Sequence, residues 1–255
     1  MSGALLAQLS DPHLRVGAGD REAADALAAA VRSVLALRPA PDAVVVTGDI
    51  ANSAAAGEYE RARELLAPLS MPVHVLPGNH DDRDALREFF APPGGDGEAG
   101  APLQYTAHVG DVRLVVCDTT RPGYDDGALD GGRLEWLEGQ LAAERAAPTV
   151  IAMHHPPITI GLPVLDAIGL APSDRLALAA LLPRAPQVSR VIAGHVHRTA
   201  FGKIGGCAAV ACTSCHEQAL LEIGASELAF VHEPPAFGVH AALDGGVVSH
   251  IQPIS

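Results

Sequence analysis

The fold of this chain is decided by residues 73–81, which read VHVLPGNHD. The first four residues have the apolar and β-branched character of a short buried strand, and the proline and glycine end that strand. Asn79, His80 and Asp81 follow at once. On its own this cluster would be interpreted as a turn, because Asn and Gly tolerate positive φ. Its meaning changes because other strands of the chain end in the same way.

Four other predicted strands also end in Asp or His. In a parallel α/β sheet, the carboxyl ends of the strands form the crevice in which ligands bind. Each cluster alone is explained by a turn, a helix cap or a packed histidine. Because all of them follow strands, we expect them to place metal-binding side chains at one rim. The clusters are Asp11-Pro12-His13 after residues 4–9, Gly48-Asp49 after residues 42–46, His154-His155 after residues 149–153, and Gly194-His195-Val196-His197 after residues 188–193.

Amphipathic helices alternate with these strands in the first two-thirds of the chain. Apolar residues at helical spacing predict helices over residues 21–37 and 173–182 and around residues 134–141. Ser53 is a candidate N-cap of a helix that extends to about residue 69. Asp82 is a candidate N-cap of a helix that ends at residue 90.

The remaining segments are β-rich. Residues 105–118 predict a hairpin that turns at residues 110–111, and short strands and turns follow Thr199. This order predicts a single α/β domain over residues 1–255. A metal-binding core of roughly residues 1–198 precedes a β-rich part, residues 199–255, that is expected to complete a second sheet. Loops over residues 91–103 and 156–172 are expected to frame the pocket.

The composition limits the partners of this protein. The chain of 255 residues is 48% hydrophobic and has a formal net charge of −13. So acidic a protein is not expected to bind nucleic acid through a general basic surface. It would also repel a phosphate at long range, so a phosphate site needs local positive charge, which metal ions can supply.

No targeting or membrane segment is predicted. The N-terminus has the pattern of a first strand, and no segment approaches the roughly 20 apolar residues of a membrane span. The cysteines do not have the spacing of a disulfide framework, and the Cys212-x-x-Cys215 pair is interpreted as buried strand residues. A cytoplasmic protein is therefore expected.

The polar clusters have the chemistry of a transition-metal site. Imidazole and carboxylate together suit Zn, Fe or Mn, and the Asn carbonyl suits the harder ions of that set. Asp11 and His13 lie two residues apart and project to the same side of an extended chain, so both can reach one ion. A single Asp carboxylate can bridge two ions.

As a set, the five clusters resemble the signature of the calcineurin-like metallophosphoesterases, most closely the class III cyclic-nucleotide phosphodiesterases and related glycerophosphodiesterases. The resemblance implies a two-sheet β-sandwich flanked by helices in four layers. It also implies two transition-metal ions per chain (Fe, Mn or Zn). Asp11, His13, Asp49 and His197 are then expected to hold the first ion, and Asp49, Asn79, His154 and His195 the second, with Asp49 bridging.

The same resemblance implies roles on the substrate side. His80 and Asp81 are expected to be catalytic, with His80 facing the substrate and Asp81 orienting it, and Asn79, His80 and His155 are expected to contact the substrate. The implied reaction is hydrolysis of 3′,5′-cyclic nucleotides or similar small phosphodiesters, by in-line attack of a hydroxide that bridges the metals. A homodimer is a further expectation.

Three alternatives to this interpretation remain. The enzyme alternatives are a phosphomonoesterase and a phosphodiesterase for glycerol-linked or other cyclic esters. The non-enzyme alternative is a protein scaffold with this fold. A scaffold is expected to have lost ligands, whereas every expected ligand position is filled in this sequence.

Overall fold

The computed structural model describes residues 3–17, 20–93 and 97–255. Residues 94–96 of the predicted loop 91–103 lie outside the described residues. The strands are β1 (Leu5–Leu9), β2 (Ala43–Thr47), β3 (Val73–Leu76), β4 (Tyr105–Val109), β5 (Val112–Val116), β6 (Thr149–Ala152), β7 (Val188–Ala193), β8 (Ala200–Ile204), β9 (Cys207–Ala211), β10 (Gln218–Ala219), β11 (Phe230–Val231), β12 (Ala236–Leu243) and β13 (Gly246–Pro253). The helices are α1 (Asp20–Ala36), α2 (Ala56–Leu66), α3 (Arg83–Phe90), α4 (Gly131–Ala143), α5 (Pro163–Ala167), α6 (Pro172–Leu181) and the 3-10 helix η1 (Leu182–Arg184).

The strands form two large mixed sheets. The first has the order β13-β12-β1-β2-β3, with β1, β2 and β3 parallel. The second has the order β4-β5-β6-β7-β9-β8, in which β5, β6, β7 and β9 are parallel. The expectation that residues 199–255 complete the second sheet is therefore wrong for β12 and β13. These strands extend the first sheet instead, because β12 pairs antiparallel with β1.

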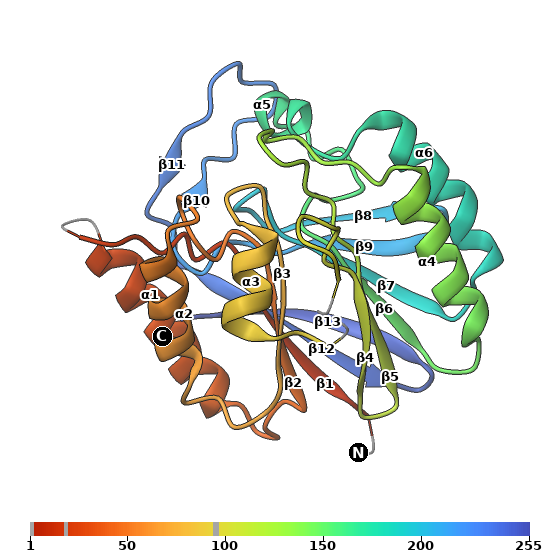
Figure 1. Ribbon diagram of the computed structural model, residues 1–255, viewed down its shortest axis with the longest axis horizontal. Helices are drawn as coiled ribbons and strands as arrows, with labels where there is room; N and C mark the ends of the chain where they lie inside the picture. Colours follow the sequence, from red (N-terminus) through yellow and green to blue (C-terminus); the bar gives the residue numbers. More distant parts are fainter. Residues whose placement is uncertain (1–2, 18–19, 94–96) are drawn as a thin grey trace.

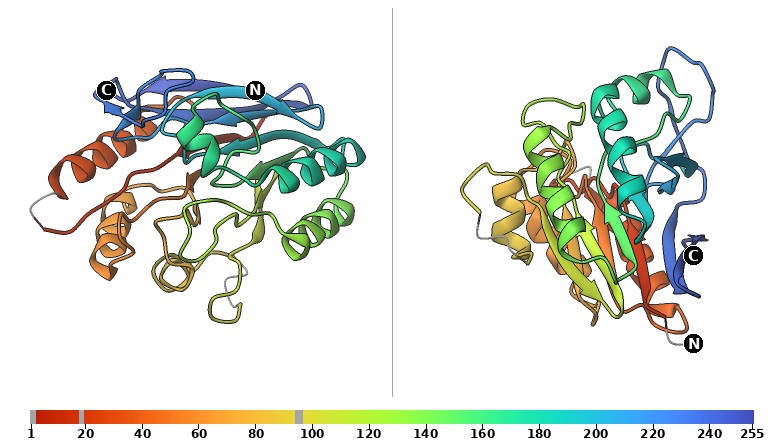
Figure 2. Two further views of the ribbon diagram at one scale, coloured as in Figure 1. Left: turned by 90° about the horizontal axis from the view of Figure 1, so that it is seen from above. Right: turned by 90° about the vertical axis from the view of Figure 1, so that its right-hand side faces the viewer.

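The two sheets pack face to face, and helices cover their outer faces (Figures 1 and 2). Helices α1, α2 and α3 lie against the first sheet, and α4 and α6 lie against the second. Strand β2 shows how the sequence builds these layers. Val44 and Val46 belong to the core beneath the first group of helices, whereas Val45 belongs to the core between the sheets. A fully apolar strand therefore serves two cores, as expected for a strand that is buried on both faces.

Local signals account for the ends of several elements. The Asp82 carboxylate accepts hydrogen bonds from the backbone N–H groups of Asp84 and Ala85, which confirms the predicted cap of α3. The prediction that Ser53 caps α2 is wrong, because the helix begins at Ala56. The Glu58 carboxylate instead accepts bonds from the Ser53 N–H, the Ser53 hydroxyl and the Ala55 N–H. Among the described residues, no helix is both long enough and apolar enough to cross a membrane.

Candidate metal centre

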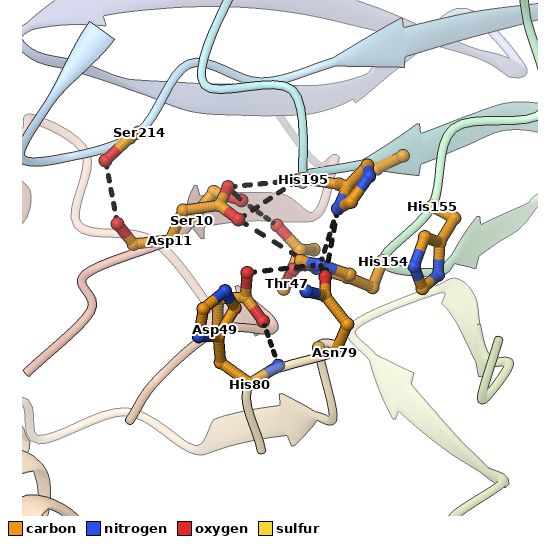
Figure 3. Close-up of polar contacts among 12 residues, drawn as sticks. Ser10, Asp11, Thr47, Asp49, Asn79, His80, His154, His155, His195 and Ser214 are labelled. Atoms are coloured by element: carbon orange, nitrogen blue, oxygen red, sulfur yellow. Dashed lines mark hydrogen bonds and ion pairs between the residues drawn. The ribbon is translucent and has the colours of Figure 1, made fainter. Parts of the chain in front are cut away.

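The polar clusters lie together because five strands end at the same edge of the paired sheets. In the first sheet, β1 leads into Asp11 and His13, β2 leads into Asp49, and β3 leads into Asn79 and His80. In the second sheet, β6 leads into His154, and β7 leads into His195 and His197. Figure 3 shows several of these side chains pointing toward one another from both sheets.

Unusual backbone conformations turn these side chains into the crevice. Asp11, His13, Asp49, His195 and His197 all have positive φ, between 46° and 71°. Among the described non-glycine residues only three others, which lie outside the clusters, share this conformation. Left-handed backbone is disfavoured for residues with a Cβ and gathers at functional sites, where the surrounding structure enforces it. The backbone thus marks the same positions as the sequence motifs.

The predicted ligands of the first ion lie around the ring of His13. Its Nε2 is 3.0 Å from Nε2 of His197 and 3.4 Å from Oδ2 of Asp49. Oδ1 of Asp11 is 3.9 Å from Nε2 of His197. Metal–ligand bonds of about 2.0–2.2 Å place neighbouring donor atoms about 3 Å apart. The Asp11, His13 and His197 donor atoms also form a group whose members all lie within 4.8 Å of one another.

The predicted ligands of the second ion meet on the other side of Asp49. Nε2 of His154 is 3.4 Å from the same Oδ2 of Asp49, 3.0 Å from Oδ1 of Asn79 and 3.2 Å from Nδ1 of His195. Nδ1 of His195 is also 3.0 Å from Oδ1 of Asn79. One carboxylate oxygen of Asp49 is therefore equidistant from a histidine of each group, which is the arrangement that a bridging ligand requires.

The hydrogen bonds behind the rings show that these donor atoms present lone pairs. His154 donates its Nδ1 proton to the Thr47 carbonyl, and His197 donates its Nδ1 proton to the Glu217 carbonyl. Their Nε2 atoms are then acceptors in the neutral ring. In a neutral ring, Nε2 of His154 would direct a lone pair at the acceptor oxygen of Asn79, 3.0 Å away. A cation between these atoms resolves the conflict, so the residues fit a metal ion.

The electrostatics of the metal-free chain agree with this fit. Burial lowers the pKa of His13 to about 3 and lowers the pKa of His195 well below its usual value, so both rings are in the neutral form that binds metals. Burial also opposes a charge on His154, but the Asp49 carboxylate outweighs it and raises the pKa of His154 to about 9. His154 in turn holds the pKa of Asp49 well below its usual value, against the effect of burial. A proton thus occupies the position between Asp49 and His154 that a metal ion would take.

Two glycines allow the ligands to approach one another. A Cβ at Gly78 would collide with the Asp49 carboxylate, and a Cβ at Gly194 would collide with the Ser10 hydroxyl and approach the Asp11 carboxylate. These glycines are therefore needed for close packing of ligands.

A buried chain of hydrogen bonds links Asp11 to residues of β1 and β2. The Gln8 amide donates to the Thr47 hydroxyl at 2.9 Å, the Thr47 hydroxyl lies 2.7 Å from that of Ser10, and the Ser10 hydroxyl donates to Asp11. His240 on β12 lies 2.9 Å from the carbonyl oxygen of the same Gln8 amide. Because the chain ends on a carboxylate, its bonds are charge-assisted and reinforce one another.

His80 and Asp81 lie together, but not in the relation that the sequence suggested. The Asp81 carboxylate accepts bonds from the backbone N–H groups of Ile50, Ala51 and Gly78. It is thus committed to holding the loops, and the expectation that it orients His80 is corrected. The His80 ring is oriented by its Nδ1, which lies 2.8 Å from the Asn52 carbonyl oxygen. The His80 side chain is exposed and lines the cavity at the metal centre.

His155 is also corrected as a substrate contact. It is fully buried, with Nδ1 2.8 Å from the Thr119 hydroxyl and Nε2 3.0 Å from the Asp125 carbonyl oxygen. Its ring packs 4.5 Å from that of His195, measured between centroids. Both nitrogens are therefore engaged, and the residue supports the ligand His195.

The cavity beside the metal centre contains residues that the sequence motifs did not indicate. It measures about 250 Å³, and its lining includes His80 and five of the proposed ligands. Apolar side chains from α5, from β11 and from the residues next to them also line it. These residues have no local signature in the sequence, because their only link to the site is tertiary. Leu165 and Ile168 lie in the loop 156–172 that was expected to frame the pocket, and Val196 lies within a predicted cluster. The residues missed are Arg15, Asn52, Glu217, Leu228 and Phe230.

Comparison with known proteins decides the family. A family model described as calcineurin-like phosphoesterase matches residues 4–199, which include every proposed metal ligand. The chain belongs to this family. It is similar to a glycerophosphodiester phosphodiesterase of Enterobacter lignolyticus, with 36% identity over 205 residues, 76% of this chain and 70% of the relative. It is also similar to a dual-specificity cAMP/cGMP phosphodiesterase of Mycobacterium tuberculosis, with 32% identity over 262 residues, 95% of this chain and 80% of the relative.

Solved structures confirm the fold of this family member. A dimetal phosphatase of Danio rerio aligns with a TM-score of 0.65 at 16% identity and covers 99% of both chains. A protein described as the anchor in the inner membrane complex of Plasmodium aligns with a TM-score of 0.67 at 16% identity, covering 100% of this chain and 90% of the other. The fold is thus shared with enzymes and with a protein described as an anchor, so the function has to be argued from the site.

Proposed function

We propose that this protein is a two-metal phosphodiesterase that hydrolyses 3′,5′-cyclic nucleotides or similar small phosphodiesters. The observation that carries the proposal is the position of Asp49, whose Oδ2 lies 3.4 Å from a histidine of each ligand group. The activities of the relatives, on cyclic nucleotides and on glycerophosphodiesters, support a diester as the substrate. The complete ligand set disfavours a scaffold.

The metal ions would supply an activated water near neutral pH and would neutralise charge on the phosphoryl oxygens. Asp11, His13, Asp49 and His197 would hold one ion, and Asp49, Asn79, His154 and His195 the other. Nitrogen and oxygen donors of this kind suit Fe, Mn or Zn. Asp11 and Asp49 offset part of the charge of two ions. The site then keeps a modest positive charge, which suits the single negative charge of a diester.

His80 is placed to serve the leaving group. Its Nδ1 is held by the Asn52 carbonyl and its ring lies 4.8 Å from that of His13, between centroids. The other ring nitrogen, Nε2, is left to interact with a substrate in the cavity. An alkoxide leaves poorly unless it is protonated, and an imidazolium is a suitable donor. His80 is therefore proposed as the general acid, with Asp81 holding the loop that carries it.

A glycerophosphodiester is the second candidate substrate. It is favoured by the 36% identity to the Enterobacter enzyme, which is a glycerophosphodiester phosphodiesterase. A cytoplasmic location and a homodimer, both predicted above, are part of the proposal, as is the identity of the metals.

The test is a substrate panel with the purified protein and with His154→Ala as a metal-site control. The panel contains cyclic AMP, cyclic GMP, glycerophosphoethanolamine, bis-(p-nitrophenyl) phosphate and two phosphomonoesters, each with Mn, Fe, Zn and no added metal. We expect the highest kcat/KM on a diester, only with metal, and we expect it to be lost in the variant. A monoester that is turned over more efficiently than every diester would contradict the proposal.

A further inference from the structure

The cavity at the candidate metal centre has an apolar wall next to the proposed ligands. The wall consists of Leu165 and Ile168 from the α5 region and Leu228 and Phe230 from the segment before and in β11. A phosphate group and a glycerol have no need of such a surface, because both are polar. A wall of this kind, next to a site for a charged group, indicates a substrate with a large apolar part.

The wall is firmly attached to the metal centre. Val196 stands between the ligands His195 and His197, and its side chain packs in the same small core as Leu165. Ile168 and Leu228 pack against the margin of that core. The position of the wall relative to the ions is therefore fixed by the same loop that carries two of the ligands.

Hydrogen bonds also position the strand that carries Phe230. The Ala219 N–H donates to the His197 carbonyl, and Ala219 pairs with Phe230 across β10 and β11. The far end of the segment is held where the Gly224 N–H donates to the Gly161 carbonyl at 3.1 Å. In Figure 1, β10 and β11 lie at the same end of the molecule as α5. Phe230 is thus presented by an ordered two-stranded element.

Phe230 has ring surface free for a ligand. Its ring centroid lies 5.3 Å from that of His197, and the two rings are nearly perpendicular, at 68°. Its side chain is not stacked on its histidine neighbour, and the residue is 48% exposed. Because His197 is a proposed metal ligand, a substrate group next to the bound phosphate would lie close to this ring.

We infer that Phe230, with Leu228 and Ile168 beside it, binds the nucleobase of the substrate and makes the enzyme prefer nucleotide diesters over glycerol diesters. This inference rests on the proposed function and refines its substrate class. A base stacks on an aromatic ring regardless of its hydrogen-bonding pattern, so the wall selects for a base and discriminates weakly among bases. Stacking of this kind contributes about 1–3 kcal/mol per base, which corresponds to roughly 5- to 150-fold in affinity.

Binding of two ligands that differ only by the base tests the inference. Titration calorimetry on the Mn-loaded protein measures Kd for 5′-AMP and for ribose 5-phosphate. We expect 5′-AMP to bind about tenfold more tightly in the wild type. Phe230→Ala is expected to reduce that ratio to about one, because it removes the stacking surface, while ribose 5-phosphate keeps its affinity. Phe230→Trp is expected to restore the ratio. Phe201→Ala, which truncates an aromatic residue that is 64% exposed on β8, is expected to leave it unchanged.

A kinetic arm separates this inference from the proposed function. Phe230→Ala is expected to lower kcat/KM for cyclic AMP about tenfold, mainly by raising KM. For glycerophosphoethanolamine, kcat/KM is expected to change less than twofold. Equal weakening of 5′-AMP and ribose 5-phosphate, or an unchanged ratio, would overturn the role of Phe230. A wild-type protein that hydrolyses neither diester would overturn the proposed function, while the ratio of the two Kd values would still report on the wall.

Discussion

At the scale of single residues, the site depends on side chains that are held in place by hydrogen bonds to their neighbours. Asp11 illustrates this. Its carboxylate receives the His195 N–H on both oxygens, at 3.0 and 3.1 Å, and its carbonyl receives the Ser214 hydroxyl at 2.7 Å. These contacts stabilise a residue with a φ of 49°. The cost of the left-handed backbone, about 1–3 kcal/mol, is thus met by hydrogen bonds to neighbouring loops.

The role of His80 is testable through the leaving group. His80→Ala is expected to lower the rate on a cyclic nucleotide by about 10²–10⁴, because the alkoxide loses its proton donor. Hydrolysis of bis-(p-nitrophenyl) phosphate is expected to change little, because nitrophenolate leaves without protonation. His250→Ala, at an exposed position on β13, is the matched control. The measurement is kcat/KM on each substrate, with metal content checked to be unchanged. Losses of similar size on both substrates would reject the role of His80 as the general acid.

The close approach at Gly78 gives a second prediction. Gly78→Ala places a methyl group against the Asp49 carboxylate, so we expect weaker metal binding and a loss of about 1–3 kcal/mol in stability. Gly139→Ala is the control, since a Cβ at this position in α4 meets nothing within 4 Å. It is expected to stabilise the protein by about 0.5–1 kcal/mol without affecting metal binding. Metal titration together with urea denaturation distinguishes the two, and normal metal affinity in Gly78→Ala would count against the packing account.

At the scale of elements, β12 connects the C-terminal part of the chain to the base of the metal centre. His240 on β12 contacts Gln8 on β1 at 2.9 Å and Ser249 on β13 at 2.8 Å. Gln8 in turn donates to Thr47 on β2 and to the Ala193 carbonyl on β7, so one amide joins both sheets. The Gln8 oxygen can only accept, so Nε2 of His240 carries a proton and donates it to Gln8.

This contact predicts a pH dependence of stability. Burial lowers the pKa of His240 to about 3. Between its ordinary value near 6.5 and about pH 3, the unfolded chain binds a proton that the native protein excludes, so stability falls as the pH falls. His240→Gln is expected to remove up to about 1.4 kcal/mol per pH unit from this slope between pH 6 and 4. The control His232→Gln, at an exposed position after β11, is expected to keep the wild-type slope. Urea unfolding at several pH values measures this pH dependence of the free energy of unfolding. Identical slopes in all three proteins would show that His240 does not contribute to it.

The strands and the ligand clusters were predictable because both have local signals. VHVL ending in GNHD is one example, and Asp82 before α3 is another. The pairing of β12 with β1 was not predictable, because the sequence of an antiparallel strand does not indicate which distant strand it pairs with. The roles of Asp81 and His155 were mistaken for a related reason, since their hydrogen-bond partners, such as Ala51 and Thr119, are distant in sequence. Phe230 is 33 positions beyond the last motif and gave no signal at all.

At the scale of the whole molecule, the candidate metal centre draws its side chains from both sheets. The first sheet provides Asp11, His13, Asp49 and Asn79, and the second provides His154, His195 and His197. Metal ions at this position would bind ligands from both sheets and would hold the two halves of the sandwich together. Since such a site is assembled only in the folded protein, the binding free energy adds to the stability of the fold.

Removal of metal is therefore expected to destabilise the entire protein. At an ion concentration about 1,000 times Kd, binding stabilises the native state by about 4 kcal/mol, which corresponds to a shift of about 10 °C in Tm for a chain of this size. Calorimetry before and after chelation, followed by addition of Mn, measures the shift and its reversal. A Tm that is independent of chelator would show that the two sheets are held together without the ions.

The central claim is that one carboxylate serves two metal ions. Elemental analysis of the purified protein tests it most directly, with Asp49→Ala as the variant and Asp111→Ala, in the β4–β5 turn, as the control. We predict two transition-metal ions per chain in the wild type and in the control. We predict that Asp49→Ala loses both ions together and nearly all phosphodiesterase activity, because Oδ2 lies 3.4 Å from a histidine of each ligand group. Full metal content with normal turnover in Asp49→Ala would contradict the account.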